Sequence, residues 1–193
     1  MALNDEKILI QQAQRGDIAA FEQLVYRYDK QVLSIAAGYV RTAEDAKDIY
    51  QEVLLKVYRC LPKFRGLSEF STWLYRVTTN VCLTHKAKKK KHRHLSIDEE
   101  HDGDDGETHA MSHTLEDESA SADQQVRDNE ISESVHHALE SLSPQQKMVF
   151  TLRHYQGYKL REIAVIMDCA EGTVKKYLFN ATQRMREQLK DFC

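Results

Sequence analysis

The stretch from Leu160 to Arg186 is the feature that most limits what this chain can fold into. Its apolar residues recur at helical spacing on both sides of a short break at 168–170: Ile163, Ala164, Ile166 and Met167 before it, then Val174, Leu178 and Ala181. The pattern predicts two helices joined by a tight turn, the layout of a helix-turn-helix, whose second helix fits a DNA major groove. Taken alone, the stretch is explained equally well by an ordinary helical hairpin with a solvated basic face.

The composition favours an all-α protein. The chain has 193 residues, 30% of them charged, with only 2 Pro and 7 Gly, and its length allows one domain or two small ones. No apolar run is long enough to span a membrane, and the polar N-terminus lacks a signal-peptide core, so we expect a cytoplasmic protein with no membrane insertion. The four cysteines are widely spaced, which favours free thiols over disulfides or a structural zinc site.

Charge divides the chain into three blocks. Residues 1–97 hold 17 Lys and Arg against 10 Asp and Glu, residues 98–128 hold 1 against 12, and residues 129–193 hold 9 against 8. The middle block also lacks an apolar period, so we predict a flexible acidic linker, 96–128, between two small helical domains, 1–95 and 129–193. Two basic regions on either side of an acidic tether indicate two contacts with a polyanion.

The linker carries three histidines, His101, His109 and His113. Their spacing is compatible with a metal ion, but nothing nearby would preorganise them as ligands. We therefore expect at most weak surface binding, with no metal site and no cofactor.

Helical periodicity predicts three helices in the first domain: 4–15, 17–40 and 42–60. Asp17 and Thr42 are the predicted N-caps, and Thr42 with Asp45 resembles a capping box. In the third helix Asp45, Asp48 and Glu52 fall on one outer face at spacings of three and four. One explanation is a solvated face, with acids in the first turn favoured by the helix dipole. It explains Asp45 well but Glu52 poorly, because Glu52 lies about two turns further along the helix. The alternative is an acidic stripe that docks a basic protein surface.

Aromatic and basic side chains alternate after Pro62, which ends the third helix: Lys63, Phe64, Arg65, Phe70, Trp73, Tyr75 and Arg76. Aromatic rings offer stacking faces for unpaired bases, and cations follow a phosphate backbone. The alternative assigns Trp73, Leu74 and Val77 to the core. Both interpretations are compatible if Trp73 is half-buried. The exposed candidates for nucleic-acid contact are then Arg65, Phe70, Arg76 and Asn80.

The second domain begins with a predicted helix over 129–141. Ser143 is then a predicted N-cap, with Pro144 at the first helical position and Gln146 at the third. The predicted buried face of this helix comprises Met148, Val149, Leu152 and Tyr155, and Gly157 is its stop signal. A domain of about 65 residues is close to the lower limit for a self-sufficient core.

In series, these segments resemble the bacterial alternative sigma factors of the extracytoplasmic-function type, in the sigma-70 family. The resemblance is carried by QRGDIAAFEQLVYRY (14–28), AEDAKDIYQEVLLKVYR (43–59), FRGLSEFSTWLYRVTTN (64–80) and the helix-turn-helix segment 141–186. It implies a non-enzymatic factor that binds core RNA polymerase and directs promoter-specific transcription initiation for a stress or envelope regulon. Promoter DNA and an anti-sigma factor, usually membrane-anchored, are the further partners that it implies.

The resemblance also assigns roles to three groups of residues. Docking on the coiled-coil of the largest polymerase subunit would involve Asp45, Asp48, Gln51, Glu52 and Leu55. Trapping a flipped minus-10 base would involve Phe64, Arg65, Phe70, Ser71, Thr72, Trp73, Tyr75, Arg76 and Asn80. Contacts to the minus-35 element would involve Lys159, Arg161, Glu171, Thr173, Lys175, Lys176, Phe179 and Arg184. Members of this family usually carry Ser-Arg or a similar pair where this chain has Lys176-Tyr177. Arginine, the side chain that most often recognises guanine, is therefore missing there.

Three other functions are compatible with parts of the sequence. A stand-alone helix-turn-helix regulator leaves the acidic stripe and the aromatic-basic loop unexplained. An enzyme lacks support, because the sequence contains no P-loop, no H-E-x-x-H and no Ser/His/Asp order that a fold would assemble. A metal-responsive switch would use the linker histidines or Cys60, Cys82 and Cys169.

Overall fold

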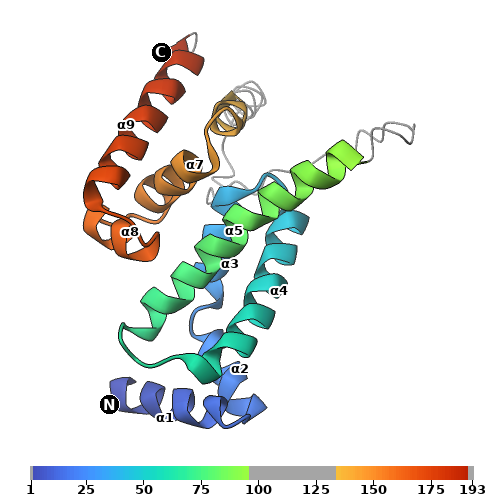
Figure 1. Ribbon diagram of the computed structural model, residues 1–193, viewed down its shortest axis with the longest axis vertical. Helices are drawn as coiled ribbons and strands as arrows, with labels where there is room; N and C mark the ends of the chain where they lie inside the picture. Colours follow the sequence, from blue (N-terminus) through green and yellow to red (C-terminus); the bar gives the residue numbers. More distant parts are fainter. Residues whose placement is uncertain (1, 96–133, 191–193) are drawn as a thin grey trace, which may run out of the picture.

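The computed structural model describes residues 2–95 and 134–190, and all regular structure in these two ranges is helical (Figure 1). The first range comprises α1 (Ala2–Gln14), α2 (Ile18–Tyr26), α3 (Asp29–Tyr39), α4 (Ala43–Cys60), the 3-10 turn η1 (Leu61–Lys63) and α5 (Phe70–Leu95). The second comprises a helical segment at 134–140, α7 (Pro144–Phe150), the π-helical turn η3 (Thr151–Tyr155), α8 (Leu160–Ile166) and α9 (Glu171–Gln188). The all-α prediction is confirmed. The predicted acidic linker and its histidines lie outside the described residues.

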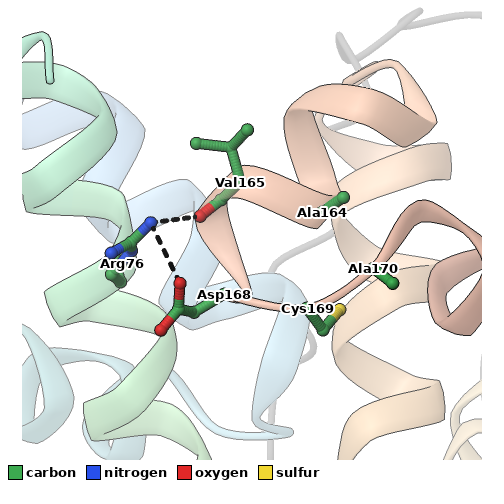
Figure 2. Close-up of a pocket in the computed structure, with 6 residues that line it drawn as sticks. All are labelled: Arg76, Ala164, Val165, Asp168, Cys169 and Ala170. Carbon is green, nitrogen blue, oxygen red and sulfur yellow. Dashed lines mark hydrogen bonds and ion pairs between the residues drawn. The ribbon is translucent and has the colours of Figure 1, made fainter.

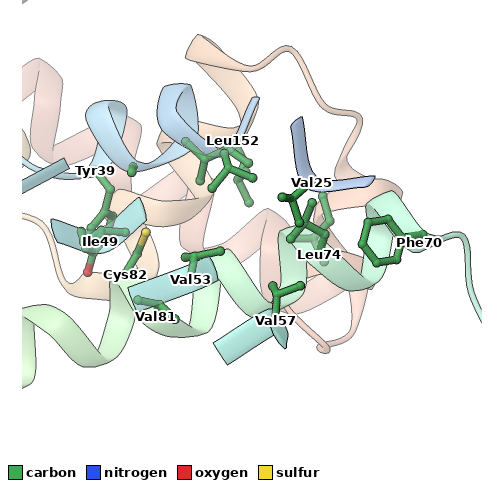
Figure 3. Close-up of a cluster of buried hydrophobic side chains, with 14 of the residues drawn as sticks. Val25, Tyr39, Ile49, Val53, Val57, Phe70, Leu74, Val81, Cys82 and Leu152 are labelled. Carbon is green, nitrogen blue, oxygen red and sulfur yellow. The ribbon is translucent and has the colours of Figure 1, made fainter. Parts of the chain in front are cut away.

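The helices α3, α4 and α5 pack against one another, and α1 lies across the end of this group beside α2 (Figure 1). Each contributes the apolar face that its periodicity predicts. Among the fully buried side chains are Leu24, Ile35, Ile49, Val53, Val57, Leu74 and Val81. Figure 3 shows most of these side chains meeting in one cluster, so the first region has a continuous hydrophobic core.

The predicted helix caps are present. The Thr42 hydroxyl accepts from the Asp45 backbone N–H at 3.0 Å, and the Asp17 carboxylate accepts from the Ala20 N–H at 3.1 Å. Ser143 and Gln146 form a reciprocal capping box, with bonds of 3.1 and 3.3 Å. These bonds satisfy N–H groups that a helix start leaves unpaired, and a cap of this kind stabilises by about 1 kcal/mol.

The predicted continuous helix over 17–40 is wrong, because the chain breaks between α2 and α3. The Tyr28 N–H donates to the Val25 carbonyl at 2.8 Å and closes a tighter turn. The Tyr28 side chain holds the break in place, since its hydroxyl bonds to Glu6 of α1 and its ring packs on Phe70. The apolar period continues through the break because both helices bury residues in the same core, so periodicity alone does not reveal it.

Phe70, predicted to be exposed, is only 2% exposed, so that prediction is also wrong. Its ring lies among those of Tyr28, Phe64 and Trp73, with centroid separations of 5.6, 5.9 and 5.6 Å. At these separations the edge of one aromatic ring attracts the face of another, and this attraction adds to the stabilisation from burying the rings away from water. Trp73 is half-buried, as predicted, and Phe70 is a core residue at the start of α5.

The second region has a divided core. One cluster is internal to it, formed by Ala138, Leu139, Leu142, Ala181 and Met185. Its remaining buried residues join the core of the first region instead: Met148, Val149, Leu152, Ile163, Ala164, Ile166 and Val174. Figure 3 shows Leu152 in the same cluster as Tyr39 and Ile49. The second region is thus completed by packing against the first.

The turn η3 departs from the predicted regular helix after Ser143. The Gln156 N–H donates to the Thr151 carbonyl at 3.2 Å, an i to i+5 bond of the π type. This wider turn leaves Tyr155 51% exposed, so its predicted burial is wrong, whereas Met148, Val149 and Leu152 are buried as predicted. Gly157 then takes a positive φ of 72° and ends the segment, as predicted.

The substitution Phe70→Ala should lower the free energy of unfolding by about 3–5 kcal/mol, because it removes a fully enclosed ring and leaves a cavity. Urea denaturation followed by circular dichroism measures this change. The control Leu67→Ala, at a side chain 90% exposed in the adjacent loop, should stay within about 0.5 kcal/mol of the parent. Equal stability of the two variants would contradict the core role of Phe70.

Candidate nucleic-acid interface

The acidic stripe of α4 is exposed along only part of its length. Asp48, Gln51 and Leu55 are exposed, and Leu55 retains 57% of its surface. Asp45 was predicted on the outer face, but its side chain is only 20% exposed and lies 3.8 Å from the imidazole of His85. The Asp45 backbone N–H also donates to the Thr42 hydroxyl, so this residue belongs to the capped first turn of α4 and its side chain faces α5. Glu52 is half-buried and has a polar interaction of its own.

Tyr58 extends this face by one turn beyond Leu55 and was missed by sequence reasoning. It is 46% exposed, and its ring meets that of Phe21 edge-on at 5.2 Å. The signal was available, because Tyr58 follows Leu55 at i+3 and lies outside the apolar period of α4. The exposed face therefore carries Asp48, Gln51, Leu55 and Tyr58, with the exposed cations Lys47 and Arg59 at its two ends.

The aromatic-basic loop between η1 and α5 is anchored at its base and exposed at its tip. The Gln14 side-chain amide donates to the carbonyls of Leu61 at 3.0 Å and Phe64 at 2.8 Å. The Phe64 ring stacks against Trp73 at 5.0 Å. Leu67 is 90% exposed beyond these contacts. Gln14 and Leu67 were not predicted as site residues, although an apolar residue in a polar loop is a recognisable signal.

The loop tip is polar around Leu67. Arg65 is exposed, as predicted, and so are Ser68 and Glu69. Gly66 has a φ of 69°, which a residue with a side chain rarely adopts, and this lets the chain reverse at the tip. The loop thus presents a cation and an apolar side chain together.

Along α5 the predicted residues are partly occupied by other contacts. Ser71, Thr72, Trp73, Tyr75 and Arg76 are half-buried, and Asn80 is exposed. The Tyr75 ring packs between Tyr28 at 6.3 Å and Tyr158 of the second region at 6.0 Å. Burial raises the pKa of the Tyr75 hydroxyl above its ordinary value.

Arg76 reaches across to the second region (Figure 2). Its guanidinium donates to the Val165 carbonyl at 2.8 Å and lies 3.5 Å from the Asp168 carboxylate. Ala164, Cys169 and Ala170 complete a shallow groove around this contact (Figure 2). Burial and the neighbouring Asp168 charge raise the pKa of the Cys169 thiol, so it is not an activated nucleophile.

The helix-turn-helix forms as predicted from α8 and α9. Asp168 has a φ of 52°, a left-handed conformation that Asp tolerates, and the Cys169 N–H donates to the Ala164 carbonyl at 3.0 Å. Ala164 of α8 and Val174 of α9 are buried, and their small side chains let the two helices approach closely. The Lys159 N–H donates to the Glu162 carboxylate at 2.8 Å and fixes the start of α8.

The outer face of α9 carries most of the predicted minus-35 residues. Phe179 is 70% exposed, and Lys176, Arg184 and Glu171 are exposed. Lys175 pairs with Glu171 at 2.9 Å across one turn. The Arg184 guanidinium donates to the Ser141 carbonyl at 2.9 Å. Lys159 and Arg161 are exposed at the start of α8, while Thr173 is half-buried.

Residues 2–95 and 134–190 show neither a metal-binding cluster nor a membrane-spanning helix. Within residues 2–95 and 134–190, no group of three or more His, Cys, Asp and Glu side chains is arranged to hold a metal ion. No helix in these ranges is long and apolar enough to span a membrane. Cys60, Cys82 and Cys169 are free thiols.

Comparison with known proteins matches both regions. Residues 24–92 match the family model for sigma-70 region 2, and residues 132–185 match that for sigma-70 region 4. The RNA polymerase sigma-H factor of Pseudomonas aeruginosa is 33% identical over 94% of this chain and 92% of its own length. The ECF RNA polymerase sigma-E factor of Escherichia coli K12 is 34% identical over 96% of this chain and 94% of its own length.

Two solved structures share the fold. CnrH in complex with the cytosolic domain of CnrY has a TM-score of 0.60 at 19% identity, covering 97% of this chain and 98% of that one. The sigma factor RpoE in complex with the anti-sigma factor NepR from Bartonella quintana has a TM-score of 0.59 at 22% identity, covering 90% and 98%. With both regions matched and relatives similar over nearly the whole length, the chain belongs to the sigma-70 family of RNA polymerase sigma factors, in its extracytoplasmic-function group.

Proposed function

We propose that this sigma factor docks on core RNA polymerase through α4 and grips promoter DNA at two places, through α5 with its preceding loop and through α9. The observation that carries the proposal is the chemistry of the exposed faces. The face on α4 presents a carboxylate and an amide beside exposed apolar side chains, the loop presents Arg65 beside Leu67, and α9 presents lysines beside Phe179. A stand-alone regulator would need only α9, so it leaves the α4 face without a role.

The α4 face is suited to a basic protein surface with an apolar centre. Asp48 supplies charge, Gln51 hydrogen-bonding capacity, and Leu55 with Tyr58 exposed apolar area. Central apolar and aromatic side chains usually contribute most of the binding energy of an interface, and surrounding charges set orientation and association rate. The coiled-coil of the largest polymerase subunit, implied by the family resemblance, is the proposed partner. Asp45 and Glu52 would act at the rim of this contact.

The loop and α5 are suited to an unpaired minus-10 base. Flipping a base out of the stack costs a few kcal/mol, which stacking and backbone contacts must offset. Leu67 and Arg65 would meet the flipped base and its phosphate, because both are exposed at the loop tip. Trp73, Phe64 and Phe70 would form the aromatic wall behind it. Ser71, Thr72, Tyr75, Arg76 and Asn80 would contact the strand along α5.

The face of α9 is suited to a major groove. Phe179 would pack against a thymine methyl group, and Lys176 would donate to a base edge or phosphate. Lys175 is held by Glu171 and would contact the backbone, with Thr173 beside it. Lys159, Arg161 and Arg184 would make the flanking phosphate contacts that fix the register of the helix on DNA.

The remaining proposals concern the whole factor. Its two domains would be 1–95 and 129–193, joined by the acidic linker 96–128. The factor would catalyse nothing itself and would act in the cytoplasm, where core polymerase and promoter DNA are found. The solved relatives CnrH and RpoE are each bound to a partner, CnrY and the anti-sigma factor NepR. An anti-sigma factor is therefore a proposed partner here, and a stress or envelope regulon is the proposed output.

The test of polymerase docking is Asp48→Lys, which should weaken binding to core polymerase about tenfold, equivalent to about 1.4 kcal/mol, because it places a cation against a basic surface. Binding is measured by fluorescence anisotropy, and output by transcription in vitro on a promoter library. The matched control Lys47→Glu, at the neighbouring exposed position, should not weaken binding. If Asp48→Lys bound and transcribed like the parent, the α4 proposal would be wrong.

At the minus-10 element, Leu67→Ala should reduce affinity for the single strand by about 1 kcal/mol, or roughly fivefold, because the loop loses its exposed apolar contact. Its thermal midpoint should match the parent, since the side chain is 90% exposed. Electrophoretic mobility shift and permanganate footprinting of promoter opening measure the two consequences. Full promoter opening by this variant would remove Leu67 from the site.

At the minus-35 element, Phe179→Ala should lose about 1–3 kcal/mol of discrimination at one base pair and leave discrimination at the others intact. Arg161→Ala should instead weaken binding to all sequences equally. The slope of the logarithm of the binding constant against the logarithm of the salt concentration should fall in magnitude by about 1, as expected for the loss of one phosphate contact. Affinity measured across single-base promoter variants and at several salt concentrations separates these outcomes. A uniform loss for Phe179→Ala would contradict its role in base recognition.

A further inference from the structure

We infer that the C-terminal end of α5 is a third DNA contact of this chain, made to the phosphates of duplex DNA on the upstream side of the minus-10 element. The contact is independent of base sequence. Its position rests on the proposed function, because it is measured from the loop assigned to the flipped base. The binding of duplex phosphates by the helix end does not depend on that assignment.

The last turns of α5 carry the densest run of positive charge in the chain. Eight of the nine residues from 86 to 94 are Lys, Arg or His: Lys86, Lys88, Lys89, Lys90, Lys91, His92, Arg93 and His94. The whole of α5, Phe70–Leu95, contains no Asp or Glu. A solvated helix surface typically mixes acids and bases at i, i+4, which pair with each other. No such pairing is available within α5, so an ion-paired surface does not explain the run.

The helix dipole explains only part of the run. Cations near a helix C-terminus are favoured, but the effect is confined to the last turn. The nine residues span about two and a half turns at 3.6 residues per turn. Lys86 with Lys90 and Lys89 with Arg93 are i, i+4 pairs of like charge, which destabilise a helix. A bound polyanion would remove this repulsion, so the run is suited to a phosphate backbone.

The basic end of α5 continues past the helix that supports its middle. The His85 imidazole lies 3.8 Å from the Asp45 carboxylate in the first turn of α4. The residues after His85 therefore extend beyond the start of α4. Figure 1 shows this end of α5 reaching past α4, at the opposite end of the helix from the aromatic-basic loop. A helix end in this position can approach DNA without any change in the packing of α4 on α5.

The composition of this helix end favours duplex DNA over a single strand. Residues 83–95 contain no Phe, Tyr or Trp, whereas single-strand binding relies on rings that stack on unpaired bases. Five of the six Lys and Arg residues are lysines, which act as point charges toward phosphate and lack the fork that reads guanine. Duplex DNA also has the higher charge density, about one charge per 1.7 Å of its axis. The helix end is therefore a candidate for phosphate contacts that carry no sequence information.

The length of α5 sets the distance between this contact and the flipped base. Lys90 lies 17 residues after Trp73 in the same helix. At a rise of 1.5 Å per residue the two positions are about 26 Å apart, the length of seven or eight base pairs at about 3.4 Å each. The strands separate at the minus-10 element, so the duplex lies on its upstream side. The contacted phosphates should lie within about eight base pairs of the flipped base, short of the minus-35 element.

The first test measures binding of the free full-length protein to duplex DNA. The variant replaces four lysines of the helix end with glutamine, whose helix propensity is similar. The replaced residues are Lys88, Lys89, Lys90 and Lys91. The probe is a fluorescein-labelled, mixed-sequence duplex of about 20 base pairs, followed by anisotropy between about 0.1 and 0.4 M NaCl.

The variant should lower the magnitude of the salt slope, the slope of the logarithm of the binding constant against the logarithm of the salt concentration, by about 2. Only about half of the positions around a helix face one DNA backbone, and each lost phosphate contact contributes about 0.9. The ratio of the variant Kd to the parent Kd should therefore be about tenfold larger at 0.1 M than at 0.4 M salt.

The matched control makes the same change of charge elsewhere in the first region. It replaces with glutamine four exposed lysines on α1, α3 and α4: Lys7, Lys30, Lys47 and Lys56. Its salt slope should stay within about 0.5 of the parent value. If the control lowered the slope as much as the helix-end variant, net charge alone would explain the result and the inference would be overturned.

The second test locates the contact without changing the protein. Core polymerase with the parent factor is bound to a promoter obtained from the library, in which neutral methylphosphonates replace phosphates roughly five to nine base pairs upstream of the flipped base. This replacement should weaken the parent complex and leave the complex of the helix-end variant unchanged. Methylphosphonates placed about 15 base pairs upstream should not distinguish the two proteins.

Each outcome supports or overturns the inference. An unchanged salt slope of the helix-end variant on the duplex overturns it, and so does a larger loss on a single strand of equal length. Equal weakening of parent and variant by the methylphosphonates overturns the position. If the variant loses its helical circular dichroism, the parent decides alone, because the methylphosphonates must weaken it at the near position and not at the far one. Failure of the parent to transcribe with core polymerase would contradict the proposed function, and the duplex measurement would still decide the contact.

Discussion

The structure depends on one constraint, that the second region is too small to bury its own apolar side chains. Its internal cluster contains only Ala138, Leu139, Leu142, Ala181 and Met185. The buried apolar residues of α7 and α8 lie instead in the core shared with the first region, among them Met148, Leu152 and Ile163. A small helical domain near the lower size limit gains stability by sharing a core in this way. The interface between the regions is consequently part of the fold as well as a surface.

Because of this constraint, some residues that pack the two regions together also belong to the face proposed to recognise DNA. Tyr75 and Arg76 belong to the predicted minus-10 face, yet one packs on Tyr158 and the other holds the α8 turn. Polar side chains border the same interface, where Gln31 donates to Gln156 and Gln156 donates to Ser34, each at 2.9 Å. The interface therefore combines an apolar core with directional hydrogen bonds, which favour one orientation of the two regions.

Local features were predictable from sequence, and contacts between distant segments were not. Thr42 and Ser143 were identified as caps because capping depends on residues within one turn. The break at Tyr28, the burial of Phe70 and the inward turn of Asp45 depend on partners in other helices, namely Glu6, Phe64 and His85. The π-helical turn at Thr151 faces Gly38 across the interface, which no local pattern encodes. The sequence thus predicts the helices that carry the candidate site, and the packing between them determines which of their side chains are exposed.

The departure of this chain from its relatives also has a structural cause. Where the family resemblance leads us to expect an arginine after the GTV motif, this chain has Tyr177, which is half-buried and packs against the shared core. A side chain committed to packing is not available to the major groove, so we propose that its neighbours on the exposed face of α9 carry base recognition. Lys176 and Phe179 occupy that face, and a lysine with an aromatic ring favours a guanine or phosphate beside a thymine methyl group. We therefore propose that the minus-35 preference of this factor differs from that of a relative that recognises guanine through arginine.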